Sequence, residues 1–109
     1  MTALHDRTCR PLPTGTPALS AGDTGHLLAE LGNGWTVLEH RLRKAYAFPS
    51  FAAGLAFVNK VGAIADAEDH HPDVMLSWGR VVIELWTHTV GGLSENDFIC
   101  AAKFDRASV

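Results

Sequence analysis

Residues 73–88 read DVMLSWGRVVIELWTH, and this stretch decides the fold. It is rich in β-branched and aromatic residues around a Gly79-Arg80 pair, which predicts a β-hairpin with strands near residues 73–78 and 81–88. Side chains alternate between the two faces of a strand. The second strand therefore has one face made of Val81, Ile83, Leu85 and Thr87, and another made of Val82, Glu84, Trp86 and His88.

The flanking sequence supplies the other elements. Residues 20–31 have a helical apolar spacing that ends at Gly32, which is typical of a glycine-capped helix. Two adjacent strands are predicted at residues 35–42 and 44–48, then a helix from Ser50 onward, and a last helix from Ser94 to Phe104 or Asp105. The order helix, strand, strand, helix, strand, strand, helix predicts an α+β domain. Its four-stranded antiparallel sheet has the helices packed on one face.

The second helix carries two apolar stripes. One contains Phe51, Leu55, Val58, Gly62 and Ala65, and the other contains Gly54, Phe57, Val61 and Ile64. One sheet face covers only one stripe, so the other predicts a contact with a second subunit. The spacing favours Val61 or Phe57 as the interface residue, although periodicity leaves open which stripe faces inward.

Composition indicates a single globular domain. The chain has 109 residues, 47% of them hydrophobic and 19% charged. Pro11, Pro13 and Pro17 sit in a segment that sustains neither helix nor central strand, so we expect residues 1–19 to be a mobile N-terminal tail and residues 20–109 to be the domain. The two cysteines, Cys9 and Cys100, imply no disulfide framework.

The sequence also indicates where the protein acts. No apolar run is long enough for a membrane span, and the first twenty residues lack the layout of a signal peptide, so we expect a soluble cytoplasmic protein with no membrane partner. The net charge is −3 with no block of basic residues, which disfavours direct binding of nucleic acid.

Three histidines are the candidate catalytic groups. His70 and His71 precede Pro72, and His88 follows near the end of the predicted hairpin. An unperturbed imidazole exchanges protons near neutral pH, so converging histidines predict an acid/base site. If the second helix extends to His70, Asp66 lies one turn before it and orients its ring. A solvated carboxylate is the alternative role for Asp66.

A zinc site is the competing interpretation of the three histidines, because catalytic zinc often has three protein ligands. Adjacent histidines do not match the usual ligand spacings, and neither cysteine is near them in the sequence. The pattern therefore favours metal-free chemistry with no cofactor.

The motifs Asp66-x3-His70-His71-Pro72, Thr87-His88 and Gly92-Leu93-Ser94-Glu95-x-Asp97 resemble the pterin-4a-carbinolamine dehydratase family, over roughly residues 20–106. The resemblance implies the same α+β architecture and a homodimer or homotetramer. It implies a hydro-lyase, 4a-hydroxytetrahydrobiopterin dehydratase, that converts 4a-hydroxytetrahydropterin to quinonoid dihydropterin in cofactor recycling. His71 is then the principal acid/base group, with His70 and His88 acting on the leaving hydroxyl.

The resemblance also implies substrate contacts, namely Asp69, His70, His71, Trp86, Thr87, His88 and Thr89. Thr89 stands where relatives commonly carry an acidic residue, which puts that contact in doubt. Asp97 matches a family position, yet Ser94-x-x-Asp97 is also typical of a helix capping box. Relatives of this fold also act without catalysis, as a dimerisation partner of a transcription factor or as a Rubisco assembly factor. Retention of the three histidines with Asp66 favours an enzyme.

Overall fold

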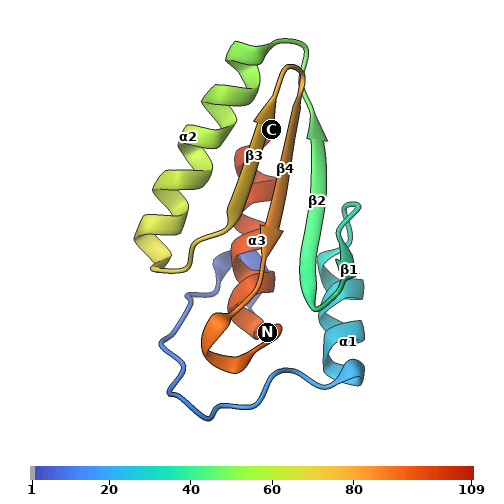
Figure 1. Cartoon of the computed structure of the whole chain (residues 1–109), viewed down its shortest axis with the longest axis vertical. Coiled ribbons are helices and arrows are strands. Elements are labelled where there is room, and N and C mark those ends of the chain that lie inside the picture. Colours follow the sequence, from blue (N-terminus) through green and yellow to red (C-terminus); the bar gives the residue numbers. More distant parts are fainter. Residues whose placement is uncertain (1) are drawn as a thin grey trace.

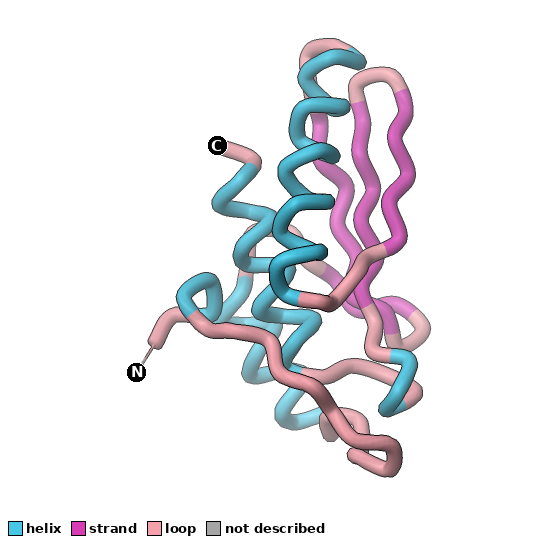
Figure 2. The backbone as a smooth tube through the Cα atoms, turned by 90° about the vertical axis from the view of Figure 1, so that its left-hand side faces the viewer, coloured by secondary structure: helices cyan, strands magenta, loops and turns pink. Residues whose placement is uncertain are grey.

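The computed structural model describes residues 2–109 and confirms the predicted α+β architecture. In chain order the elements are the 3-10 helix η1 (Leu4–Asp6), α1 (Ala21–Leu31), β1 (Thr36–Leu38), β2 (Arg41–Ala47), α2 (Phe51–Glu68), β3 (Asp73–Ser77), β4 (Arg80–Leu85), the 3-10 helix η2 (His88–Val90) and α3 (Glu95–Ala107). The sheet is antiparallel in the order β1-β2-β4-β3 (Figure 1). The helices lie on one side of it (Figure 2).

The core lies between the sheet and the helices. On β4, one of the two faces described above is buried, with Val81, Ile83 and Leu85 fully inaccessible. From α3, Phe98 and Phe104 are likewise fully buried. Burying a side chain of this size stabilises a fold by about 1.5–3 kcal/mol. None of the helices within residues 2–109 has both the length and the apolar character required to cross a membrane.

The first hairpin turns at Glu39 and His40, which both have positive φ. The sequence placed this turn between residues 42 and 44, and that boundary was wrong. Two-residue hairpin turns usually contain Asn-Gly or Asp-Gly, which makes them recognisable in a sequence. Glu39-His40 carries no such signal, so the predicted first strand continued to residue 42, four residues past the end of β1 at Leu38.

Helix α2 begins after Ser50, whose Oγ accepts a hydrogen bond from the Ala53 N–H at 3.1 Å. It ends at Glu68 and does not extend to His70, because Asp69 is in the left-handed conformation at φ 51°. The His70 N–H then folds back and donates to the Ala65 carbonyl oxygen at 3.1 Å. His70 and His71 therefore lie in the connection from α2 to β3.

The inward stripe of α2 is the one that contains Phe57 and Val61, which are almost completely buried. The prediction that one of these two residues forms a subunit interface was therefore wrong, because both already pack in the core of this chain. The N-terminal part of the other stripe faces outward, where Phe51 is 45% and Leu55 is 42% exposed, whereas its last residue, Ala65, is buried.

The N-terminal segment lies against α3. Leu4 of η1 is buried in the core, and the Leu19 N–H donates to the Leu93 carbonyl oxygen at 2.9 Å. The proline content of this segment did not predict these two contacts. A single buried leucine is enough to hold a segment without regular secondary structure against the domain. The mobility of residues 1–19 stays a prediction.

Candidate active site

His70 is held by a buried carboxylate from α3. Its Nε2 lies 2.6 Å from Oδ1 of Asp97, whose side chain is fully inaccessible to solvent. Because a carboxylate oxygen only accepts hydrogen bonds, Nε2 of His70 carries the proton and Nδ1 is left free. The sequence assigned Asp66 to this histidine, and that pairing was wrong because the chain leaves the helix before His70.

Asp97 connects His70 to the loop after β4. Its Oδ2 accepts hydrogen bonds from the Thr87 hydroxyl at 2.9 Å and from the Ser94 N–H at 2.9 Å. The Ser94 hydroxyl in turn donates to Thr87 Oγ1 at 2.7 Å, since the single Thr87 proton is used on Asp97. The predicted capping box of Ser94 and Asp97 is confirmed. Asp97 thus caps α3 and positions His70 at the same time.

His71 is paired with Asp66 on the surface. Its Nε2 lies 2.9 Å from Asp66 Oδ1, and the two side chains are 57% and 83% exposed. Asp66 therefore orients a histidine, as predicted, but its partner is His71 and not His70. By the same argument as for His70, the free nitrogen of His71 is Nδ1. Two adjacent histidines thus present the same ring nitrogen, each fixed by its own carboxylate.

His88 is the first residue of η2 and its ring stacks on Trp86, with ring centroids 3.7 Å apart. The guanidinium of Arg41 lies 4.8 Å from the centroid of the same Trp86 ring. No described hydrogen bond within residues 2–109 joins His88 to His70 or His71. The link is indirect, because Thr87 precedes His88 and bonds the carboxylate that holds His70.

The remaining residues that were predicted to contact substrate differ in their exposure to solvent. Asp69 and Thr89 are exposed, and Trp86 is half-buried. Thr87 is buried, with its hydroxyl on Asp97 and its N–H donating to the Gly92 carbonyl oxygen at 2.8 Å. The role of Thr87 in binding substrate stays a prediction, and in the structure its side chain supports Asp97. Ser94 was missed as a site residue, although its capping-box spacing was visible in the sequence.

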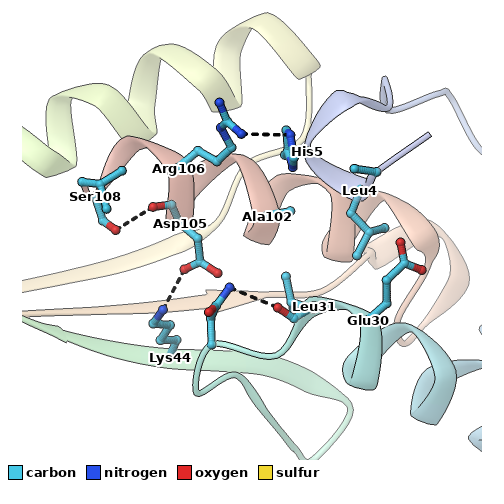
Figure 3. Close-up of a pocket in the computed structure, with 12 residues that line it drawn as sticks. Leu4, His5, Glu30, Leu31, Lys44, Ala102, Asp105, Arg106 and Ser108 are labelled. Carbon is cyan, nitrogen blue, oxygen red and sulfur yellow. Dashed lines mark hydrogen bonds and ion pairs between the residues drawn. The ribbon is translucent and has the colours of Figure 1, made fainter. Parts of the chain in front are cut away.

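A cavity of about 580 Å³ lies at the C-terminal end of α3, and its lining does not include His70, His71 or His88 (Figure 3). Two pairs of its polar side chains bind each other. Lys44 Nζ lies 2.7 Å from Asp105 Oδ1, and Arg106 donates to His5 Nε2 at 3.0 Å. A catalytic group needs a free atom to act on substrate, so this cavity is the weaker candidate for an active site.

The two adjacent histidines have the parts of an acid/base site, namely two imidazoles that are each oriented by a carboxylate, and His88 lies in η2, on the loop that follows β4. Within residues 2–109, the histidines, cysteines and carboxylates do not gather in groups of three or more that could hold a metal ion. Metal-free chemistry stays a prediction.

Comparison with known proteins agrees with these features. A sequence model of the family described as Pterin 4 alpha carbinolamine dehydratase matches residues 17–107. A Rickettsia canadensis (strain McKiel) protein named "Putative pterin-4-alpha-carbinolamine dehydratase" is 48% identical over 96% of this chain and 97% of its own length. A protein of the same name from Nitrosomonas eutropha is 43% identical over 94% of this chain and 90% of its own length.

Two solved structures share the fold. A Brucella melitensis protein described as a transcriptional coactivator/pterin dehydratase has a TM-score of 0.80 at 24% identity, covering 84% of this chain and 99% of that one. A pterin dehydratase-like protein, described as a RuBisCO assembly factor in the alpha-carboxysome, has a TM-score of 0.61 at 26% identity, covering 72% and 93%. On the match over residues 17–107 and the identity to these relatives, the chain belongs to the pterin-4a-carbinolamine dehydratase family.

Proposed function

We propose that this protein is a 4a-hydroxytetrahydropterin dehydratase that works by histidine acid/base catalysis. The observation that carries the proposal is the pair of adjacent histidines, each held by its own carboxylate so that Nδ1 is free. Family membership supports the reaction class, since the relatives above carry that name.

The reaction places two demands on the site. Hydroxide is a poor leaving group, so an acid must protonate the 4a-hydroxyl while a base removes the proton from N5. The two electrons of the C4a–O bond leave with the water, and the N5 lone pair forms the new C=N bond. An unperturbed histidine is roughly a quarter protonated at pH 7, so one site can hold both forms.

The structure supports a division of roles. His71 is the exposed member of the pair, so its Nδ1 is accessible to a flat substrate, and we assign it the principal proton transfer. His70 is only 13% exposed and is fixed by Asp97, which suits a group that polarises the leaving hydroxyl from a defined position. His88, stacked on Trp86, assists from η2. Asp69, Trp86 and Thr89 are proposed to contact the pterin.

A protein-binding role is the second candidate. The observation that favours it is the likeness to the RuBisCO assembly factor, with a TM-score of 0.61 at 26% identity. A protein-binding role does not require the free Nδ1 atoms. An assay of dehydratase activity therefore distinguishes the two candidate functions.

The test is stopped-flow decay of chemically generated 4a-hydroxytetrahydropterin, with and without the protein. The proposal expects faster decay with protein, unchanged after exhaustive chelation because no step uses a Lewis acid. Decay at the uncatalysed rate with folded protein would favour the binding role. Activity that is lost on chelation and restored by zinc would overturn the metal-free mechanism.

A further inference from the structure

Two thiols from distant parts of the chain face each other near His70. Cys9 lies in the N-terminal segment and Cys100 in α3, and both are free. Their Sγ atoms are 3.6 Å apart although the residues are 91 positions apart in the sequence. A disulfide has an S–S distance of about 2.05 Å, so the two sulfurs need to approach by roughly 1.5 Å. Cys9 lies outside any helix or strand, so its side chain can make this movement.

The approach of the two thiols is built into the packing. The Cys9 N–H donates to Glu68 Oε1 at 2.8 Å, at the C-terminal end of α2. The next residue, Arg10, exchanges two hydrogen bonds with the Asn96 side chain, through its N–H at 3.2 Å and its carbonyl oxygen at 2.7 Å. These three bonds hold the backbone of the segment at Cys9 against α2 and α3. The sulfur of Cys9 is thereby kept over Cys100.

The two cysteines differ in access to solvent. Cys9 is half-buried, whereas Cys100 is fully buried. The hydrogen bond with Cys9 and the burial of Cys100 raise the pKa of the Cys100 thiol. A dissolved oxidant therefore meets Cys9 first, because reactivity toward oxidants follows thiolate character and exposure. Cys100 remains a protonated thiol that is positioned to react second.

We propose that Cys9 and Cys100 form a reversible redox modification site, in which a peroxide converts the dithiol to an intramolecular disulfide. The Cys9 thiol releases its proton, and the thiolate attacks one oxygen of hydrogen peroxide. The O–O bond breaks to give a sulfenic acid and hydroxide, and the hydroxide takes up the released proton to become water. The Cys100 sulfur then attacks Cys9 Sγ, the S–O bond breaks, and the thiol proton leaves with the hydroxyl as a second water. The two sulfurs lose two electrons in total and peroxide gains them, and a dithiol reductant reverses the change.

The modification site adjoins His70 through Cys100. Its Sγ lies 3.9 Å from the carbonyl oxygen of His70, within reach of a weak S–H hydrogen bond. The disulfide removes that S–H and fastens the N-terminal segment to α3 behind His70. The proposal concerns thiols outside the acid/base chemistry, so its test does not depend on the proposed reaction.

The experiment treats the folded, reduced protein with an equimolar amount of hydrogen peroxide and quenches free thiols with N-ethylmaleimide. We expect a mass loss of about 2 Da, no maleimide adduct, and a linked peptide pair containing Cys9 and Cys100, all reversed by dithiothreitol. Closing a loop of this length should raise the Tm of the oxidised form by roughly 10 °C. Cys9→Ser and Cys100→Ala should each abolish the Tm shift.

Peptide mapping separates the alternatives. Addition of oxygen at the exposed Met75 is distinguished by its own peptide and does not bear on the thiols. A disulfide between two chains, a Cys9 that stops at the sulfinic acid, or two thiols still open to maleimide would each overturn the proposal. The Cys9→Ser variant leaves the buried Cys100 in place and keeps the test valid if Cys100→Ala fails to fold.

Discussion

At the scale of single residues, the two adjacent histidines are distinguished by their carboxylates. His70 is held by the fully buried Asp97, whereas His71 is held by the exposed Asp66. A buried carboxylate with several donors fixes its partner firmly, whereas an exposed ion pair is worth only about 0–1 kcal/mol. The site therefore combines one rigid imidazole with one accessible imidazole.

The accessible imidazole should carry most of the proton transfer. We expect His71→Ala to lower the dehydration rate by about 10²–10⁴-fold, the range usual for one acid/base group. Its Tm should stay close to that of the unmodified protein, because the His71 side chain is largely exposed. Stopped-flow kinetics and thermal melting measure the two effects. A folded variant with full activity would remove His71 from the mechanism.

The two carboxylates form a matched pair for a second prediction. Asp97→Asn should cost about 3 kcal/mol of unfolding free energy, because three donors then face a buried amide. Asp66→Asn should change it by less than about 0.5 kcal/mol, since both partners are exposed. Urea denaturation measures both. Equal effects of the two substitutions would contradict the assignment of Asp97 as the buried anchor.

At the scale of elements, α3 is joined to the first hairpin by one carboxylate. Asp105 accepts hydrogen bonds from Trp35 Nε1 at 2.9 Å, Lys44 Nζ at 2.7 Å and the Tyr46 hydroxyl at 2.6 Å. The same helix holds His70 through Asp97 at its other end. Helix α3 therefore fixes the sheet and the histidine connection relative to each other.

This attachment predicts a loss of stability in alkali. Burial and then the hydrogen bond to Asp105 raise the pKa of Tyr46 above its ordinary value of 10.0. Above that pH an unfolded tyrosine loses its proton while native Tyr46 keeps it, so the native state binds more protons and its stability falls as pH rises. Tyr46→Phe should remove this contribution. The free energy of unfolding, measured with urea between about pH 9 and 11.5, should therefore fall less steeply with pH for the variant than for the unmodified protein. Equal pH slopes for the two proteins would refute the argument.

At the scale of the whole molecule, the outer stripe of α2 is partly uncovered among residues 2–109. Phe51 and Leu55 are nearly half exposed on it, while the inner stripe is buried against the sheet. Exposed apolar side chains that line one face of a helix are typical of a contact between subunits. With the family resemblance, this favours a homo-oligomer formed through α2.

Two substitutions on opposite faces of α2 test the assembly. Leu55→Glu should dissociate the oligomer and leave each subunit folded, because the charge falls on the exposed stripe. Phe57→Glu should unfold the protein, since it places an unpaired charge in the core. Sedimentation velocity and circular dichroism report the two outcomes. An unmodified protein that sediments as a monomer at micromolar concentration would refute the assembly.

The sequence by itself determined the order of the elements, the division of β4 into two faces, the cap at Gly32 and the capping box of α3. These features repeat over a few residues, because backbone geometry sets helical and strand periods locally. Only the tertiary structure decided which carboxylate holds which histidine, which stripe of α2 faces inward, and that Cys9 meets Cys100. Such partners are chosen by packing between segments far apart in the chain, which no local period encodes.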